Sequence, residues 1–193
     1  ISEPEHFEVL FLGAHLGWEY RFLRGLCEAH PQLRLAAVIQ TGPASFYQTG
    51  LNGDDEGRLE GFPTSPEVFH RFDAVVLDGR AVGALGEAGA AALVGFVDRR
   101  GGGLLVVGPT ADLPESLREV VPVLPAPAGA LMRREYLEAN PEFIFDVDPG
   151  QVLASPGSLP VPPGGPLWLS RELKRGARAA AVLRGSGLTA LAA

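Results

Sequence analysis

The segment from Phe72 to Pro109 constrains the fold more than any other part of the chain, because it reads as strand, helix, strand. The apolar run Val75–Leu77, closed by Asp78-Gly79, is typical of a strand that is buried on both faces. Apolar residues then recur at helical spacing, three glycines end that helix, and Leu104–Val107 forms the next buried strand. A helix between two such strands predicts a crossover that joins parallel strands in a right-handed sense.

The beginning of the chain predicts a second unit of the same kind. Phe7–Ala14 is expected to be a strand, Trp18–His30 a helix that ends before Pro31, and Leu33–Ile39 a strand. Two apolar stripes at three- and four-residue spacing compete for the inward face of that helix. They are Tyr20, Leu23 and Cys27 on one side, and Trp18, Phe22 and Leu26 on the other.

A Gly-rich stretch, Thr41–Pro63, separates these two units and is longer than an ordinary connection. We expect a loop there that is either functional or mobile. Ser65 then precedes Pro66 as an N-cap precedes the first residue of a helix, which predicts a short helix that ends near Phe72.

The C-terminal part of the chain has a different composition. Residues 112–121 predict one more helix, 122–129 an extended linker, 131–140 a short helix or an irregular arm, and the sequence FIFDVD a strand. Residues 155–166 are rich in proline and glycine and predict no regular structure. Two apolar runs, 177–184 and 188–193, flank a glycine-containing turn with the spacing of a β-hairpin. We therefore expect antiparallel strands at an edge of the sheet.

These patterns predict an α/β protein with a mainly parallel, doubly wound sheet and a C-terminal β-hairpin extension. At 193 residues the chain is expected to form a single domain, with its core in residues 7–125 and an arm plus hairpin in residues 126–193. It begins at Ile1 and ends in an apolar run at Ala193, so we expect it to be excised from a longer protein.

Charge and composition exclude several classes of function. The net charge of −7 and the isoelectric point of about 5.1 argue against sequence-independent binding of nucleic acid, which needs a basic face. Cys27 is the only cysteine, which excludes an intrachain disulfide and a thiolate cluster for zinc. No stretch approaches the roughly 20 apolar residues that cross a bilayer. We expect a soluble domain without a membrane span, in a compartment that the sequence leaves open.

The order of motifs disfavours phosphate and metal sites. Gly101–Gly103 precedes a strand, whereas a phosphate-binding loop follows a strand and opens a helix. The four histidines are scattered without ligand spacing, so no metal and no cofactor is expected. Only His15 directly follows a predicted strand, where it either faces a cleft or bonds the backbone.

Candidate site residues therefore come from the carboxyl ends of the predicted strands, where open α/β folds keep their sites. Thr110 stands where a nucleophile would stand after the strand that leads to Pro109, but every histidine lies upstream of it and no base accompanies it. Thr110 or Asp112 is better explained as a cap of the following helix. Asp78 and Asp112 each follow a strand and would line one crevice together, although Asp-Gly after a strand is also ordinary turn chemistry.

The sequence FDAVVLDGR, followed by LGEAGAAALVGFVDRRGGGLLVVGP, resembles the class I glutamine amidotransferase-like superfamily. There, a strand with D-V-V precedes a helix that ends in F-V-x-x-G-G-G, and the next strand leads to the nucleophile. WEYRFL with Pro31 is similar to a stretch in the amidotransferase-like domain of large bacterial membrane proteins that often carry von Willebrand factor A-type domains. The resemblance covers residues 7–125 and implies a flavodoxin-like fold, which is a three-layer sandwich, within a membrane-anchored bacterial protein.

The catalytic residues of that superfamily are absent from this chain. Its enzymes carry G-x-C-x-G at the elbow and a downstream histidine with an acidic partner, whereas this chain has Gly108-Pro109-Thr110-Ala111-Asp112 and no downstream histidine. We therefore expect no catalytic residue, and a domain that binds a small ligand or a protein partner, such as another domain of the parent chain. Its cleft is expected to hold His15, Trp18, Asp78, Pro109, Thr110 and Asp112.

Two alternatives remain open at this point. One is a hydrolase-like enzyme of unknown substrate that uses His15 with Asp78 or Asp112, which requires those side chains to meet within hydrogen-bond reach in a concave pocket. The other is a purely structural module. Trp18 is itself open to two interpretations, as an aromatic anchor of the cleft or as a core residue on the first turn of its helix.

Overall fold

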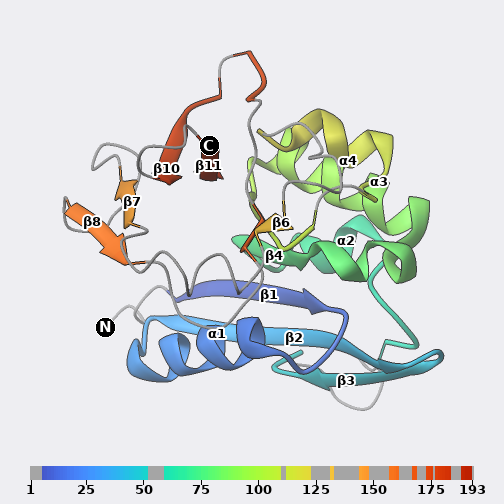
Figure 1. Ribbon diagram of the computed structural model, residues 1–193. Coiled ribbons are helices and arrows are strands. Elements are labelled where there is room, and N and C mark those ends of the chain that lie inside the picture. Colours follow the sequence, from blue (N-terminus) through green and yellow to red (C-terminus); the bar gives the residue numbers. More distant parts are fainter. Residues whose placement is uncertain are drawn as a thin grey trace. The chain divides into compact units, whose positions relative to one another are not determined.

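The chain divides into two compact units, Ile1–Val107 with Asp112–Val120, and Gly108–Ala111 with Val121–Ala193 (Figure 1). The computed structural model describes residues 6–51, 59–109, 112–122, 131–132, 144–147, 157–160, 167–168, 173–175, 177–183 and 188–192.

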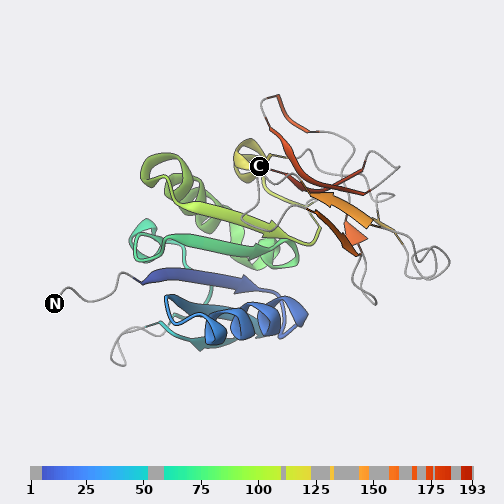
Figure 2. The same cartoon turned by 90° about the vertical axis from the view of Figure 1, so that its left-hand side faces the viewer.

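The first unit contains a five-stranded, mainly parallel sheet in the order β3-β2-β1-β4-β5. Strand β1 pairs in parallel with both β2 and β4, β4 pairs in parallel with β5, and β3 runs antiparallel to β2. In Figure 2, β5 (yellow-green), β4 (green) and β1 (blue) lie one below another. The strands are β1 (Phe7–Gly13), β2 (Leu33–Gly42), β3 (Ser45–Thr49), β4 (Ala74–Asp78) and β5 (Gly103–Val107). The predicted α/β class with a mainly parallel sheet is confirmed.

Helices cover both faces of this sheet. The right-handed crossovers from β1 to β2 and from β4 to β5 run in opposite directions along the sheet, which places α1 and α3 on opposite faces. Helix α3 packs against α2 and α4. The helices are α1 (Trp18–Ala29), α2 (Pro66–Phe69), the 3-10 helix η2 (Gly79–Ala81), α3 (Val82–Arg100) and α4 (Glu115–Val120).

Helix α3 ends where its sequence predicts. Gly101 adopts the left-handed conformation, with a φ of 72°, and its backbone N–H bonds to the carbonyl of Val97. The helix begins at Val82 and contains a kink at Gly86, whose φ is 66°. The next residue, Gly102, has no space for a side chain, because a Cβ there would lie 2.1 Å from the ring of Phe96.

Burial shows which of the two apolar stripes of α1 faces the core. Tyr20 is only 6% exposed and its ring lies 5.9 Å from that of Phe11 on β1, whereas Trp18 is 80% exposed. Leu23 packs beside Tyr20 against the same cluster. Burying a side chain as large as Phe11 stabilises a fold by about 1.5–3 kcal/mol, so this contact fixes the helix on the sheet. The cluster on this face consists of Val9, Phe11, Tyr20, Ala37, Ile39 and Val76.

One segment of the described chain, Gly79–Arg100, is long and apolar enough to span a bilayer by length and composition, with a mean hydropathy of 1.4. Our expectation that no stretch approaches that length is therefore wrong. Leu93 and Phe96 in this segment are nevertheless fully buried, and Phe96 packs against Phe69 of α2 with ring centroids 6.2 Å apart. The apolar composition of α3 is explained by its place in the core of the first unit.

The stretch that we expected to be a loop, Thr41–Pro63, contains strand β3. Gln48 of β3 anchors the returning chain, since its side-chain oxygen accepts the Leu59 N–H at 3.0 Å and its amide bonds the Leu59 carbonyl. Gly50 ends the strand with a φ of 70°, and a Cβ there would meet the Leu35 carbonyl oxygen at 2.4 Å. Residues 52–58 lie outside the described part of the chain.

In the second unit, four strands form an antiparallel sheet in the order β11-β10-β7-β8. They are β7 (Ile144–Val147), β8 (Gly157–Pro160), β10 (Ala179–Leu183) and β11 (Leu188–Ala192), and a separate pair joins β6 (Leu131–Met132) to β9 (Leu167–Trp168).

The second unit corrects three expectations. Strand β7 falls within the predicted FIFDVD strand, but β8 lies in the Pro/Gly-rich stretch 155–166, for which we expected no regular structure. The predicted helix or arm at 131–140 starts as strand β6, and its remainder lies outside the described residues, as do 123–129 of the predicted linker. Strands β10 and β11 pair with each other in a sheet of their own, and do not extend the edge of the parallel sheet.

Candidate functional site

The topology of the first unit points to the carboxyl ends of β1 and β4. From β1 the chain moves to β2 on one side, and β4 lies on the other side of β1, so the strand order reverses between β1 and β4. Open α/β sheets bind their ligands in the crevice at such a switch point. The register that pairs Leu12 with Leu77 brings Ala14 and Asp78, each just beyond this pair, to the same place.

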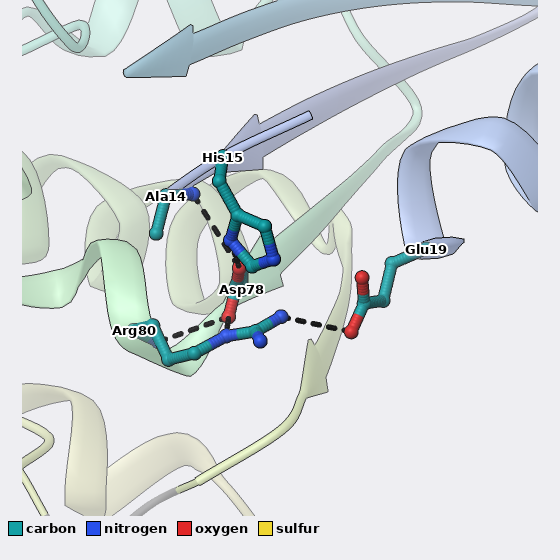
Figure 3. Close-up of polar contacts among 5 residues, drawn as sticks. All are labelled: Ala14, His15, Glu19, Asp78 and Arg80. Carbon is teal, nitrogen blue, oxygen red and sulfur yellow. Dashed lines mark hydrogen bonds and ion pairs between the residues drawn. The ribbon is translucent and has the colours of Figure 1, made fainter. Parts of the chain in front are cut away.

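Asp78 is the one buried charged residue of the described chain, with 1% of its surface exposed. Its Oδ1 accepts the backbone N–H of Arg80 at 3.0 Å and the Nε–H of the same residue at 2.8 Å (Figure 3). Its Oδ2 accepts the backbone N–H of Ala14 at 3.4 Å. The side chain therefore caps η2 and ties the end of β1 to the end of β4.

Arg80 links this carboxylate to helix α1. Its Nη2 lies 2.8 Å from Oε1 of Glu19, in the first turn of α1, so one guanidinium bridges two carboxylates (Figure 3). Burial lowers the pKa of Arg80, but the hydrogen bonds and charges of Asp78 and Glu19 outweigh it and raise that pKa above its ordinary value. Arg80 is therefore a permanent cation, and it neutralises the buried carboxylate.

His15 stands beside Asp78 on the turn that follows β1. Its Nδ1 lies 3.8 Å from Oδ2 of Asp78, which is an ion-pair distance but longer than a hydrogen bond, and half of its side chain is exposed. Gly17 allows this placement, because a Cβ at that position would lie 2.9 Å from the His15 Nε2 and 2.6 Å from a carboxylate oxygen of Glu19. The Gly17 N–H also bonds the His15 carbonyl at 2.8 Å, which closes the turn.

His15 also lines an open depression of about 580 Å³. The walls come from the turn after β1 and from the end of β2, which supplies an amide, a hydroxyl and backbone groups. The lining residues are Ala14, His15, Leu16, Gln40, Thr41, Gly42 and Pro43. The Thr41 hydroxyl donates to the Ser45 carbonyl at 3.2 Å and so keeps its lone pairs for another partner.

Two of the other predicted cleft residues, Trp18 and Asp112, do not line this depression. Trp18 is exposed and its ring is covered by the guanidinium of Arg21 at 5.6 Å, so the interpretation of Trp18 as a core residue is wrong. Asp112 is exposed and makes no hydrogen bond or ion pair with the described His15 or Asp78. Pro109 belongs to the second unit, and Thr110 lies outside the described residues.

Comparison with known proteins adds no relative. No family model, no curated protein and no solved structure matches the chain. The site is therefore interpreted from its own geometry. Among the described residues, no group of three or more histidine, cysteine, aspartate or glutamate side chains is arranged to hold a metal ion.

The polar groups of this site are of two kinds: some are paired with one another, and others border the open depression. Asp78, Arg80 and Glu19 satisfy one another at the switch point, whereas His15 lines the depression together with Gln40 and Thr41. We did not anticipate Arg80 or Glu19. A signal was present, because an arginine follows Asp-Gly at the end of a strand and a glutamate opens the helix after the neighbouring strand.

Proposed function

We propose that this chain is a non-catalytic amidotransferase-like domain that binds a small polar ligand beside His15. Its parallel strands follow the order β2-β1-β4-β5, which corresponds to the flavodoxin-like order 2-1-3-4, and supports the flavodoxin-like sandwich that the resemblance implies. The antiparallel pairing of β10 with β11 supports a C-terminal hairpin extension. A membrane-anchored bacterial parent protein is part of the same proposal.

The observation that carries the binding function is that His15 stands beside a locked carboxylate and also lines an open depression. Asp78 lies beside Nδ1 of the imidazole and Gly17 beside Nε2, and the depression that His15 lines is open to a ligand. A small polar group held at the carboxyl ends of parallel strands is the usual arrangement of ligand sites in open α/β sheets. Gln40 and Thr41 add an amide and a hydroxyl that orient such a ligand.

Catalysis is disfavoured by what surrounds the imidazole. A nucleophilic mechanism needs a hydroxyl or thiol within hydrogen-bond reach of the base. Within the described residues, the polar contact of His15's side chain is with Asp78, and Cys27 lies at the other end of α1. Burial raises the pKa of the Cys27 thiol, which further disfavours a nucleophilic thiolate.

The test is a fragment screen followed by chemical-shift mapping on the ¹⁵N-labelled chain. We use a library of small amides and carboxylic acids, and expect shifts to cluster at the backbone amides of 14–16 and 40–42. His15→Ala and Thr41→Ala should each weaken binding about three- to tenfold, the worth of one hydrogen bond. His30→Ala is the matched control, because His30 is exposed at the opposite end of α1. Binding that maps elsewhere, or that His15→Ala leaves unchanged, contradicts the proposal.

A hydrolase-like enzyme is the second candidate, favoured by the 3.8 Å approach of His15 Nδ1 to Asp78 Oδ2. In that case Asp78 would orient the imidazole, and Nε2 would take a proton from water as it attacks an ester or amide. Hydrolysis of p-nitrophenyl acetate by the purified chain distinguishes the two. A turnover that is lost in His15→Ala and kept in His30→Ala favours the enzyme, and equal rates in all three proteins favour the binding module.

A further inference from the structure

Helix α1 presents a continuous apolar face to solvent. At about 100° per residue, Trp18, Phe22, Gly25, Leu26 and Ala29 fall within an arc of about 100° on the side turned away from the core. All five are exposed, Trp18 by 80%, Phe22 by 72% and Leu26 by 38%. No charged residue falls within this arc, and the guanidinium of Arg21, from its flank, lies over the Trp18 ring at 5.6 Å. Surface aromatic residues occur singly in most proteins, so a contiguous strip of this kind marks an interaction surface.

This apolar strip of α1 is complementary in shape to a second copy of itself. A second copy of α1 laid antiparallel, with the two-fold axis beside Leu23 and Arg24, places Trp18 opposite Ala29 and Phe22 opposite Gly25 of the other copy. Each large ring then meets a small residue, and by symmetry every contact forms twice. Gly25 is open enough to receive a ring, because a Cβ at Gly25 would find nothing within 4 Å.

The charges beside the strip are also self-complementary. Arg21 and Glu28 lie on the same flank of α1, and a two-fold axis perpendicular to the paired helices keeps equal flanks adjacent. In the register above, Arg21 is displaced from Glu28 of the other copy by two residues, or about 3 Å along the axis. Glu28 uses Oε1 for Arg24 at 2.8 Å, and its Oε2 is available for Arg21 of the second copy.

From these observations we infer that the face of α1 formed by Trp18, Phe22, Gly25, Leu26 and Ala29 binds a second copy of this chain as an antiparallel helix pair. The inference is independent of the ligand site beside His15. The 12 residues of α1 make a helix about 18 Å long, which is short against the roughly 800 Å² per partner of a standard interface. We therefore expect a weak dimer, with a dissociation constant on the order of 100 µM.

The inference is tested by sedimentation equilibrium of the full chain at loading concentrations between about 10 and 500 µM, a range that spans the expected dissociation constant. We expect the mass to rise with concentration from the 20.3 kDa of the monomer toward twice that value. Gly25→Gln should weaken association at least tenfold, since the added side chain occupies the place of the Phe22 ring of the other copy. The monomer tolerates the change, because the position is open and glutamine favours a helix more than glycine does. Gly83→Gln is the matched control at another exposed, open helical glycine, on α3.

Charge reversal tests the antiparallel register. Arg21→Glu and Glu28→Arg should each weaken association, and the double variant should restore it, because the pair re-forms between copies with opposite signs. A chain that stays monomeric at 500 µM overturns the inference, as does a dimer that Gly25→Gln leaves intact. If Gly25→Gln abolishes the dimer but the double charge variant does not restore the association that the two single charge variants lose, the antiparallel pairing is overturned.

Discussion

Replacing Asp78 by asparagine is the sharpest test of how the carboxyl ends of β1 and β4 are held together. Asparagine keeps the shape of the side chain but has one acceptor oxygen in place of two. Asp78 uses Oδ1 for two hydrogen bonds from Arg80 and Oδ2 for the N–H of Ala14. In the variant, the side-chain NH₂ must face either Arg80 or Ala14, so a donor is turned toward a donor in a buried position.

The expected loss of unfolding free energy depends on the partners that Arg80 keeps in the variant. A hydrogen bond to a charged group contributes about 1.5–3 kcal/mol, and removing one partner of a fully buried ion pair costs about 3–5 kcal/mol. Arg80 is one-third exposed and keeps Glu19, so water and that carboxylate offset part of the loss. We expect Asp78→Asn to lower the free energy of unfolding of the first unit by about 2–3 kcal/mol. Glu19→Gln removes only the outer pair and should cost about 0–1 kcal/mol.

The assay is native-state hydrogen exchange of the β1 and β4 amides, because a chain with two compact units does not give one simple unfolding transition. Leu10, Leu12 and Val75 are suitable reporters, since their residues are fully buried. Salt at about 1 M should reduce the effect of Glu19→Gln and leave that of Asp78→Asn, since buried pairs are screened less. A cost below about 0.5 kcal/mol for Asp78→Asn, or one equal to that of Glu19→Gln, would refute the reasoning.

Three further predictions concern other parts of the first unit. Gly50→Ala combines a φ of 70° with a Cβ 2.4 Å from the Leu35 carbonyl oxygen, whereas at Gly101 space is open and the left-handed strain of an alanine alone costs about 1–2 kcal/mol. The urea midpoint of the first unit, followed through the methyl NMR signals of the buried Leu10 and Leu12, should therefore fall further in Gly50→Ala than in Gly101→Ala; equal midpoints contradict this. Burial, and then the interaction with the Tyr47 hydroxyl, raises the pKa of Tyr20 above 10.0, so its stabilisation is present below pH 10.0 and is lost as the pH rises through the folded-state pKa. Tyr20→Phe should flatten the alkaline fall in the urea stability of the first unit, followed through the same methyl signals, and an unchanged pH profile counts against this. Because burial raises the pKa of the Cys27 thiol, iodoacetamide at pH 8 should alkylate the native chain more slowly than the urea-unfolded chain; equal rates contradict it.

The parallel part of the sheet was predictable because its signals are local. The run Val75–Leu77 is apolar throughout, as a strand with helices on both faces must be, and the left-handed glycine at 101 ends the intervening helix. Strand β3 was missed because it is a short edge strand in a Gly-rich stretch. Its position depends on Gln48 bonding the distant Leu59, a contact that no local pattern announces.

The candidate site was predictable only in part, for a related reason. Both His15 and Asp78 follow a strand, so the topology alone brings them to one edge. Their partners depend on register and side-chain reach. Arg80 meets Glu19 across 61 residues of sequence, and this pair follows only once the alignment of Leu12 with Leu77 is known. Charge pairs at the surface of a sheet edge leave no periodic signature in a sequence, which is why the two residues were not anticipated.

The helix α1 shows how a pattern that is ambiguous for folding becomes informative for function. Two apolar stripes suited its inward face, and the structure uses Tyr20 and Leu23 for the core. A single fold needs only one of them, since the sheet offers α1 one face to cover. The stripe that contains Trp18 and Phe22 is therefore unexplained by folding, and its exposure costs solubility without stabilising the monomer. An apolar stripe that the fold leaves in water is best explained by a second molecule, and for this helix a copy of the same chain satisfies both the shape and the charges.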